Sequence, residues 1–574
     1  MKMNDLPLLS VENLDISFTS KEDGKAFRAV RDLSFSVAEG EIVGIVGESG
    51  SGKSVTALSI VRLLDKATYG GKIRFFSEGK DTDLLSCTSR QMQAFRGHQI
   101  GMVFQEPMTS LNPSMRCGEQ VAESLRLHLG YSRKQARVEV LKLFAEVLLP
   151  DPGKAYRSYP HEISGGQKQR VMIAMAISCK PRLLIADEPT TALDVTVQKA
   201  ILELLRNLQR KHGISVIFIS HDLGVVANIA DRAVVMYKGE KMEEGSVRDL
   251  FLHPKHPYTQ GLLACRVPLD RRYVHLPTVQ DFMKEDCPEG IRFQVIPEED
   301  WRIRAEGFCR TEPMLEVEHL SKRYPLPRKW GQPRRYFHAV DDVSFSLYEG
   351  ETLGLVGESG CGKTTLGRSI LRLIEPTKGE VRYKGQDLCR LDRNAMRGLR
   401  PQLQIIFQDP YASMNPRQTV GMILTEPMKL HRVLDNDARR REKAAELLVQ
   451  VGLCADDMHR YPHEFSGGQR QRICIARALA LNPRLIICDE SVSALDVSVQ
   501  AQVLNLLNEL KEKYRLTYIF ISHDLSVVKY MSHRVMVMQK GKLEEMQFAD
   551  DLYRHPQKAY TRQLLDAVPK INFN

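Results

Sequence analysis

One glycine-rich octamer, GESGSGKS, runs from Gly47 to Ser54, and a nearly identical octamer, GESGCGKT, recurs from Gly357 to Thr364. Both fit the pattern G-x-x-x-x-G-K-[ST], which needs two glycines, a lysine and a hydroxyl residue at fixed spacings. Each octamer follows a short apolar segment, EIVGIV or ETLGLV, and precedes a helical pattern, VTALSIVRLL or TLGRSILRLI. This strand–loop–helix context predicts two phosphate-binding loops rather than two incidental glycine turns.

The chemistry of such a loop assigns roles to its residues. Its backbone N–H groups surround phosphate oxygens, and the helix that follows directs the positive end of its dipole at them. Lys53 and Lys363 are expected to reach the β- and γ-phosphates of a nucleotide, and the hydroxyls of Ser54 and Thr364 to bind Mg²⁺. We expect every residue of both octamers to contact the nucleotide: Gly47, Glu48, Ser49, Gly50, Ser51, Gly52, Lys53 and Ser54, and Gly357, Glu358, Ser359, Gly360, Cys361, Gly362, Lys363 and Thr364.

The rest of the chain repeats as well, and this repeat decides the architecture. YPHEISGGQKQRVMIAMA (Tyr159–Ala176) recurs as YPHEFSGGQRQRICIARA (Tyr461–Ala478), and LLIADEPTTALDVTVQ recurs as LIICDESVSALDVSVQ. Apolar runs typical of buried strands alternate with helical patterns, which predicts an α/β fold in each unit. We place a first domain at 1–268, a second at 314–574, and a connector of mixed charge without a counterpart at 269–313.

Composition narrows the class of protein. With 574 residues, 43% of them hydrophobic, the chain can build more than one core. A net charge of +10, spread along the chain, does not by itself indicate nucleic acid. The N-terminus lacks an apolar signal core and no stretch approaches the ~20 apolar residues of a membrane span, so we expect a soluble protein. The 11 cysteines are scattered without a C-x-x-C pair, which favours free thiols over disulfides or structural zinc.

A pair of carboxylates ends one apolar strand pattern in each unit: Asp187 with Glu188, and Asp489 with Glu490. A strand that crosses the core and ends in two acids places them at the carboxyl edge of the sheet, where phosphates dock. We expect Asp187 and Asp489 to hold Mg²⁺ through its water shell. Glu188 and Glu490 are expected to orient and deprotonate the attacking water.

These motifs, in the same order in both units, resemble the nucleotide-binding domains of ATP-binding cassette (ABC) proteins, over almost the whole chain outside the connector. The resemblance implies two tandem P-loop NTPase domains, each with a helical subdomain, that hydrolyse ATP with Mg²⁺. Departures from the family pattern are small: Ile163 replaces the common leucine before SGGQ, and Ser491 replaces the usual proline after Glu490. Neither unit has lost its lysine, carboxylate pair or histidine, so both sites are expected to be active.

Further site residues rest on the resemblance. Gln105 and Gln408 match the Q-loop, whose side chain touches both the metal and the water and senses the membrane partner. His221 and His523 follow FIS strands, where the family places a histidine against the γ-phosphate.

The resemblance also implies contacts of Asp194 and Asp496 with the nucleotide site. Phe18 and Tyr324 stand where the family stacks an aromatic ring on adenine. For Phe18 a place in the hydrophobic core is the alternative.

The SGGQ segments precede helices and so offer a second helix N-terminus to a phosphate. One domain cannot comfortably wrap both its own glycine-rich loop and its own SGGQ helix around one ATP. In the family, the SGGQ of one domain closes over the nucleotide of the other, which here implies two ATP molecules sandwiched between the fused domains. The residues concerned are Ser164, Gly165, Gly166 and Gln167, and Ser466, Gly467, Gly468 and Gln469.

Three classes of protein use paired cassettes without membrane spans: importer energy subunits, ribosome-associated translation factors, and DNA-repair or chromosome ATPases. The DNA class normally inserts zinc modules or long coiled coils, and neither is visible here. Translation factors tend to carry a long helical linker, whereas this connector contains Pro277, Pro288, Gly290 and Pro297 and cannot be one continuous helix. A twin-cassette ATPase that acts on ribosomes or DNA remains the alternative.

Finer motifs favour import. FQEPMTSLNP, FQDPYASMNP and the HPYT tail resemble the peptide, nickel and glutathione branch of the importers. This resemblance implies an ATP-driven subunit for peptides or peptide-like solutes at the cytoplasmic face of the inner membrane. The implied partners are two membrane permeases and an extracytoplasmic solute-binding protein, and no nucleic acid. The substrate stays open, because selectivity resides in those partners.

Overall fold

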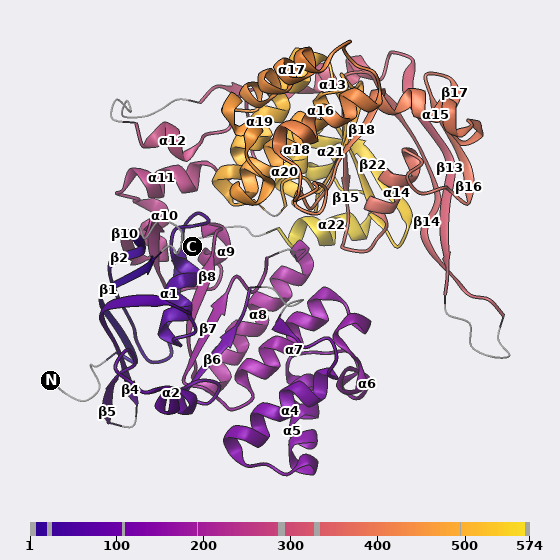
Figure 1. Cartoon of the computed structure of the whole chain (residues 1–574). Coiled ribbons are helices and arrows are strands. Elements are labelled where there is room, and N and C mark those ends of the chain that lie inside the picture. The colour runs from indigo at the N-terminus through magenta and orange to yellow at the C-terminus, as the bar shows by residue number, and fades with distance from the viewer. Residues whose placement is uncertain are drawn as a thin grey trace.

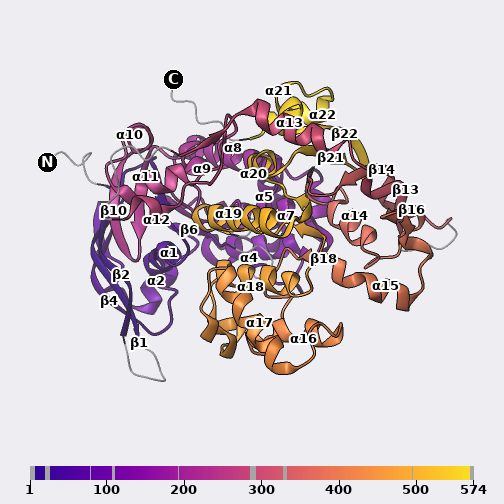
Figure 2. The same cartoon turned by 90° about the horizontal axis from the view of Figure 1, so that it is seen from above.

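The computed structural model describes residues 7–19, 26–77, 79–105, 110–191, 193–284, 293–326, 333–493 and 495–568. Each half of the chain folds into an antiparallel sheet, a mostly parallel central sheet and a set of helices (Figure 1). Seen from above, the two antiparallel sheets lie on opposite sides of the molecule (Figure 2). The predicted α/β class is confirmed.

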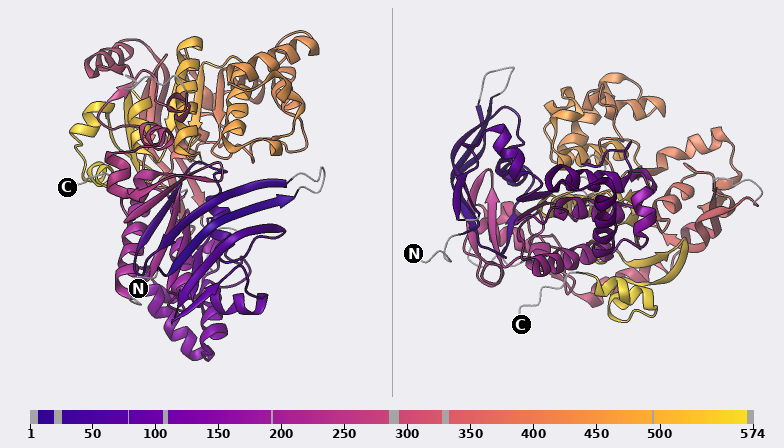
Figure 3. Two further views of the ribbon diagram at one scale, coloured as in Figure 1. Left: turned by 90° about the vertical axis from the view of Figure 1, so that its left-hand side faces the viewer. Right: turned by 90° about the horizontal axis from the view of Figure 1, so that it is seen from below.

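The sheets of the first half place its site. The antiparallel sheet has the order β2-β1-β4-β5 and extends from one side of this half (Figure 3). The central sheet has the order β10-β9-β3-β8-β7-β6, with β10 antiparallel to β9 and the other pairs parallel. The strands are β1 (Leu9–Thr19), β2 (Ala26–Val37), β3 (Ile42–Val46), β4 (Ala67–Ser77), β5 (Lys80–Asp83), β6 (Ile100–Val103), β7 (Leu183–Asp187), β8 (Ser215–Ser220), β9 (Arg232–Tyr237) and β10 (Glu240–Ser246).

The second half repeats this plan. Its antiparallel sheet has the order β14-β13-β16-β17, and its central sheet the order β18-β19-β20-β15-β21-β22. The strands are β13 (Pro313–Pro325), β14 (Tyr336–Tyr348), β15 (Thr352–Val356), β16 (Lys378–Tyr383), β17 (Gln386–Asp387), β18 (Leu403–Ile406), β19 (Leu485–Asp489), β20 (Thr517–Ile521), β21 (Arg534–Gln539) and β22 (Lys542–Phe548).

Burial on both faces explains why these strands read as continuous apolar runs. In β3, Val43 and Ile45 join the core beneath the antiparallel sheet, while Ile42 and Val46 join the core beneath the helices. Successive side chains of a strand point to opposite faces, so a strand covered on both sides needs apolar residues throughout. The strand that carries each glycine-rich loop is therefore held rigidly by two cores.

The helices follow the same duplication. In the first half they are α1 (Lys53–Ile60), α2 (Ser89–Phe95), α4 (Cys117–Leu129), α5 (Arg133–Glu146), α6 (Pro152–Arg157), α7 (Gly165–Ile177), α8 (Val195–His212), α9 (Leu223–Ala227), α10 (Val247–Leu252) and α11 (Pro257–Ala264). In the second half they are α14 (Lys363–Ile370), α15 (Arg393–Leu399), α16 (Val420–Leu430), α17 (Asp437–Gln450), α18 (Gly467–Leu479), α19 (Val497–Tyr514), α20 (Leu525–Met531), α21 (Ala549–Arg554) and α22 (Ala559–Asp566).

The helical subdomains expected from the resemblance are formed by α4 to α6 in the first half and by α16 and α17 in the second. They lie at opposite ends of the molecule (Figure 1). None of the described helices combines the length and the apolar character needed to cross a bilayer.

The connector folds onto the second half. Its described elements are β11 (Arg272–Tyr273), α12 (Val279–Phe282), β12 (Val295–Ile296) and α13 (Glu298–Phe308). β11 pairs with β12, and α12 packs against α11 of the first half. The described part of the connector is therefore not one continuous helix, in agreement with its prolines.

The contacts that hold the connector on the second half include an ion pair, a ring stack and a pair of hydrogen bonds. The Arg272 guanidinium, which is 4% exposed, pairs with Asp550 at 2.7 Å. The Trp301 ring stacks on the His533 ring with centroids 4.6 Å apart. The Asn505 side chain exchanges two hydrogen bonds with the backbone of Leu276.

The first half lacks the residues for these contacts. At the positions that correspond to Asn505, His533 and Asp550, it carries Glu203, Asp231 and Arg248. An arginine at the last position would repel the guanidinium that Asp550 binds. These contacts with the connector are thus made by the second half alone.

The ion pair between Arg272 and Asp550 provides a test of connector docking. Asp550→Ala should lower the free energy of unfolding by about 3–5 kcal/mol, because it leaves a buried arginine charge without a partner. Arg302→Ala, which breaks an exposed pair with Glu306, should cost less than about 1 kcal/mol. Urea unfolding monitored by tryptophan fluorescence measures both, and equal losses would contradict the docking described here.

Candidate functional site

The two glycine-rich loops connect β3 to α1 and β15 to α14, as the sequence predicts. Gly52 and Gly362, the residues before the two helices, have φ angles of 97° and 110°. A Cβ at Gly362 would lie 2.0 Å from the carbonyl oxygen of Ala339. Backbone conformation and space both exclude a side chain here.

Each loop lysine is held inside its own loop. Lys53 Nζ donates to the carbonyl oxygens of the first two loop residues, at 2.6 and 2.8 Å, and Lys363 Nζ does the same at 2.7 and 3.0 Å. Burial lowers the pKa of Lys53, although nearby carboxylates, that of Asp496 first among them, favour its charged form.

The predicted metal-binding residues lie together in both halves. Ser54 Oγ donates to Asp187 Oδ1 at 3.0 Å, and Thr364 Oγ1 donates to Asp489 Oδ1 at 2.8 Å. Burial raises the pKa of Asp187 to about 6 and also raises the pKa of Asp489. Among the described residues, the buried Oδ2 of Asp489 has no hydrogen-bond partner. The hydroxyl and the carboxylate both supply oxygen ligands, and this carboxylate has an oxygen without a hydrogen-bond partner. Such a set of ligands fits Mg²⁺.

Glu188 lies at the centre of the remaining predicted side chains of the first half. Its Oε2 accepts hydrogen bonds from Gln105 Nε2 at 3.1 Å and Thr191 Oγ1 at 2.8 Å, and His221 Nδ1 lies 3.3 Å away. Burial disfavours the charged form, but the bonds with His221 and Thr191 outweigh it and lower the pKa of Glu188 to about 2. The carboxylate is therefore charged at neutral pH.

The second half repeats this arrangement with one difference. Gln408 Nε2 donates to Glu490 Oε2 at 2.8 Å, and His523 Nδ1 lies 3.5 Å from the same oxygen. Burial again opposes the charge, and the contact with His523 lowers the pKa of Glu490. Ser493 donates to the backbone oxygen of Glu490, whereas Thr191 in the first half donates to a carboxylate.

The backbone at both glutamates is in the left-handed region, with φ angles of 46° at Glu188 and 49° at Glu490. This conformation is uncommon for residues with a side chain and costs about 1–3 kcal/mol. Both glutamate N–H groups donate to the strand beside them, at Ile219 and Ile521. The same left-handed conformation thus recurs at the same position in both halves.

The repeated tail supplies a tyrosine to each loop, a role that the sequence analysis did not assign. The Tyr258 hydroxyl on α11 accepts a hydrogen bond from the Glu48 N–H at 3.1 Å, and the Tyr560 hydroxyl on α22 accepts one from the Glu358 N–H at 3.2 Å. Burial raises the pKa of both tyrosines. The tyrosine shared by the two tails was the available sequence signal.

Asp194 and Asp496 cross the interface between the halves. Asp496 Oδ2 accepts from the Ser49 N–H at 2.6 Å, and Asp194 Oδ2 accepts from the Ser359 N–H at 3.4 Å. Each aspartate thus reaches the glycine-rich loop of the other half rather than its own. The halves are therefore related head to tail at these loops.

The SGGQ segments cap their helices as predicted. The Ser164 hydroxyl accepts from the Gln167 N–H, Ser466 caps α18 in the same way, and the glutamine in each case accepts from the serine N–H. Within the described ranges, no hydrogen bond joins either segment to the glycine-rich loop of the other half. Their closure over a nucleotide stays a prediction.

The two proposed adenine-stacking residues differ in burial. Phe18 is half-buried and packs against the core of the first half, as its alternative interpretation expected. Tyr324, at the end of β13, is 37% exposed, with the Lys322 ammonium 5.3 Å from its ring centroid. Stacking on adenine stays a prediction for both.

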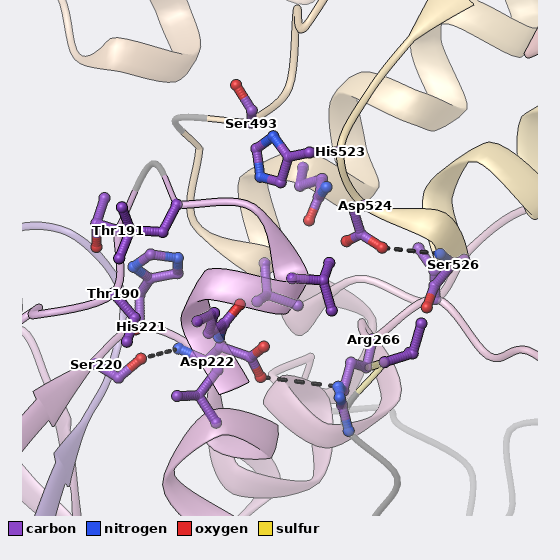
Figure 4. Close-up of a pocket in the computed structure, with 18 of the residues that line it drawn as sticks. Thr190, Thr191, Ser220, His221, Asp222, Arg266, Ser493, His523, Asp524 and Ser526 are labelled. Carbon is purple, nitrogen blue, oxygen red and sulfur yellow. Dashed lines mark hydrogen bonds and ion pairs between the residues drawn. The ribbon is translucent and has the colours of Figure 1, made fainter. Parts of the chain in front are cut away.

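A cavity of about 140 Å³ lies between the halves, and His221 and His523 line it from opposite sides (Figure 4). Arg266 Nε lies 3.7 Å from Asp222 Oδ1 in this cavity. The second half has no arginine at the corresponding position, and among the described residues its Asp524 has no ion pair. The surroundings of the two histidines are thus not identical.

Comparison with known proteins agrees with this geometry. The model of the family described as ABC transporter matches residues 30–191 and 340–493, one match in each half. The chain belongs to the ABC transporter family. It is therefore an ATP-binding protein that hydrolyses ATP. A second family model, described as the C-terminal region of oligopeptide/dipeptide transporters, matches residues 242–293 and 545–574.

Curated relatives of this ABC protein resemble it over nearly its whole length. The glutathione import ATP-binding protein GsiA of Pectobacterium atrosepticum is 49% identical over 98% of this chain and 89% of the relative. GsiA of Escherichia coli K12 is 48% identical over the same shares. A solved dimeric ATP-binding cassette, MJ0796 with ADP and Pi, is 29% identical over 41% of this chain and 99% of its own, with a TM-score of 0.38.

The tail tyrosines are open to a direct test. In a Lys363→Ala background, Tyr258→Phe should raise the Kd for ATP about fivefold, because one hydrogen bond contributes about 1 kcal/mol. In a Lys53→Ala background the same change should leave the Kd unaltered, and Tyr560→Phe should raise it instead. Titration with a fluorescent ATP analogue measures each Kd. Equal effects in both backgrounds would show that the tyrosines act on stability and not on their own loops.

Proposed function

We propose that this chain is the energy-coupling subunit of an importer for peptides or peptide-like solutes. The observation that carries the proposal is the match to the oligopeptide/dipeptide transporter C-terminal region in both halves, beside a match to the ABC transporter family in each half. The same tails supply Tyr258 and Tyr560 to the phosphate loops, so this region is part of each site. The relatives named for glutathione import make glutathione the first solute to test.

The proposed partners are two membrane permeases and, outside the membrane, a solute-binding protein. The permeases would dock on the Q-loops and on the helical subdomains. Leu127 on α4 is 76% exposed, and Met422 and Leu430 on α16 are each 57% exposed. Leu127 and Leu430 stand at corresponding positions of the two halves, as two equivalent docking surfaces would require. This docking would place the chain at the cytoplasmic face of the inner membrane.

In the proposed reaction, the loop N–H groups and lysines bind the phosphates of ATP. Ser54 and Asp187, with Thr364 and Asp489 in the other half, would hold Mg²⁺, which neutralises phosphate charge when bound. Glu188 and Glu490 take a proton from the attacking water and orient it. The histidine beside each glutamate fixes the carboxylate in position.

We further propose that two ATP molecules lie between the halves, each between a loop of one half and the SGGQ segment of the other. The hydrogen bonds of Asp194 and Asp496 to the opposite loops support this pairing, because they place the two halves head to tail. An SGGQ helix would then add N–H donors and its dipole only when the halves close.

The double change Glu188→Gln with Glu490→Gln tests the import function. ATP should still bind, while hydrolysis falls by about 10²–10⁴-fold, since the base is lost and the phosphate loops are intact. In cells that lack the chain, the wild type should restore uptake of glutathione or a dipeptide, whereas the double variant should not. Both proteins should fractionate with membranes. Sedimentation with ribosomes and not with membranes would reverse the assignment.

The sandwich has its own test. Lys53→Ala combined with Ser466→Arg should hydrolyse ATP almost as fast as either single variant, because both changes disable one site. Lys53→Ala combined with Ser164→Arg should be slower by a further factor of about 10²–10³, because both sites are then damaged. Steady-state ATPase rates decide between them, and the reverse order would mean that each half works alone.

A further inference from the structure

A second cavity, separate from the ATP sites, lies between the connector and the second half. Its volume is about 570 Å³. One wall is formed by β11, β12 and the start of α13, and the other by α19 and the end of α20. No motif of the sequence analysis falls in this cavity, and the proposed reaction uses none of its side chains.

The α19 wall carries a buried cation without an anionic partner among the described residues. Lys511 is only 8% exposed, yet among the described residues its ammonium makes no ion pair and no hydrogen bond. The ring centroid of Phe308 lies 5.9 Å from its Nζ. Burial lowers the pKa of Lys511 to about 8, although Glu512 favours the charged form. Buried lysines are almost always paired, so this one is suited to an anionic group from outside the chain.

The corresponding residue of the first half shows that the fold does not need this lysine. The helices α8 and α19 have the same length and align without gaps, which places Gln209 opposite Lys511. Gln209 Nε2 donates to the carbonyl oxygen of Gly40 within its own half, at 2.6 Å. The second half has therefore replaced an internal hydrogen bond by a charge that lines a cavity.

The connector wall carries a complementary charge. Asp300, in the first turn of α13, makes no ion pair within the described part of the chain. Of the other acids of the cavity, Glu512 pairs with Arg304 at 3.3 Å, and Glu509, on the α19 wall, lies 3.5 Å from His275 Nε2. Among the described residues, the α19 wall thus has a cation without an anionic partner, and the connector wall has an anion without an ion pair.

The lining of the cavity is partly apolar. Val295 and Ile296 of β12 line the same cavity, with Val274 at the end of β11. A ligand with a carboxylate, an ammonium and a small apolar body meets all three features. Charged groups that leave water need such paired, hydrogen-bonded partners.

We propose that this cavity binds a small zwitterion, a di- or tripeptide, with its carboxylate at Lys511 and its ammonium at Asp300. The choice of a peptide rests on the proposed function, because peptides are the solutes the importer would deliver. The connector contacts both halves. A ligand beneath it would therefore make connector docking depend on the concentration of peptide.

Tryptophan fluorescence gives a direct readout. The chain has two tryptophans. Trp301 lines the cavity, and Trp330 lies outside the described residues. Trp330→Phe leaves Trp301 as the single reporter. Titration of this variant with alanyl-leucine should give a saturable change in fluorescence. The N-acetylated dipeptide and the dipeptide amide should each bind at least about tenfold more weakly, because each lacks one charge-assisted hydrogen bond.

Two variants assign the charges to the two walls. Lys511→Gln, which copies Gln209 of the first half, should weaken dipeptide binding about tenfold. This variant should then bind the dipeptide and the dipeptide amide equally well. Asp300→Asn should bind the dipeptide and the N-acetylated dipeptide equally well. Both variants should keep the basal ATPase rate, which shows that they are folded.

Equal binding of the three ligands, or no saturable change with millimolar dipeptide, would overturn the proposal. The proposal would also be overturned if Lys511→Gln bound the dipeptide more weakly but still bound it more tightly than the dipeptide amide. None of these measurements depends on transport. Failure here would therefore leave the import function standing, and failure of uptake would leave the site standing.

Discussion

The backbone of each glycine-rich loop is held at the carboxyl edge of a parallel sheet that is buried on both faces. The strand before the loop is clamped between two cores, and the helix after it begins at a glycine whose conformation and surroundings admit no side chain. That placement presents loop N–H groups to an anion, and the carboxylates of Asp194 and Asp496 already accept from one of them in each loop. The same sheet edge brings Asp187 and Glu188 beside the loop, because β7 ends where β3 ends. The candidate chemistry depends on this shared edge.

The two halves share this constraint and differ where they meet other parts of the chain. Their sheets, loops and tail tyrosines correspond closely. One difference lies at the connector: Asn505, His533 and Asp550 of the second half bind it, and the first half carries other residues at those positions. The cavity between the halves also has an arginine on one side only. Duplication thus produced two equivalent cores, and later divergence made their surfaces unequal.

Much of the site could be predicted from the sequence, because its residues are close neighbours in the chain or lie at strand ends. Lys53 and Ser54 belong to one loop, and a βαβ pattern is enough to place Asp187 beside them. The arrangement of Gln105 and His221 around Glu188 could be expected from the resemblance, although their distances could not. Phe18 shows the limit of such inference, because the aromatic position in a strand fits core and ligand contact equally well.

The sequence by itself determined the fold class, the duplication, the two phosphate loops and the acids beside them, since each is encoded in local periodicity or a short motif. Only the tertiary structure decided which surfaces meet. Asp496 reaches Ser49 in the opposite half, Tyr258 returns from the tail to its own loop, and Arg272 of the connector reaches Asp550 in the second half. The physical reason is that these contacts join residues far apart in the chain through hydrogen bonds and burial that carry no periodic signal. Which residues meet in these contacts depends on the shapes of two folded surfaces, and those shapes exist only after both cores have formed.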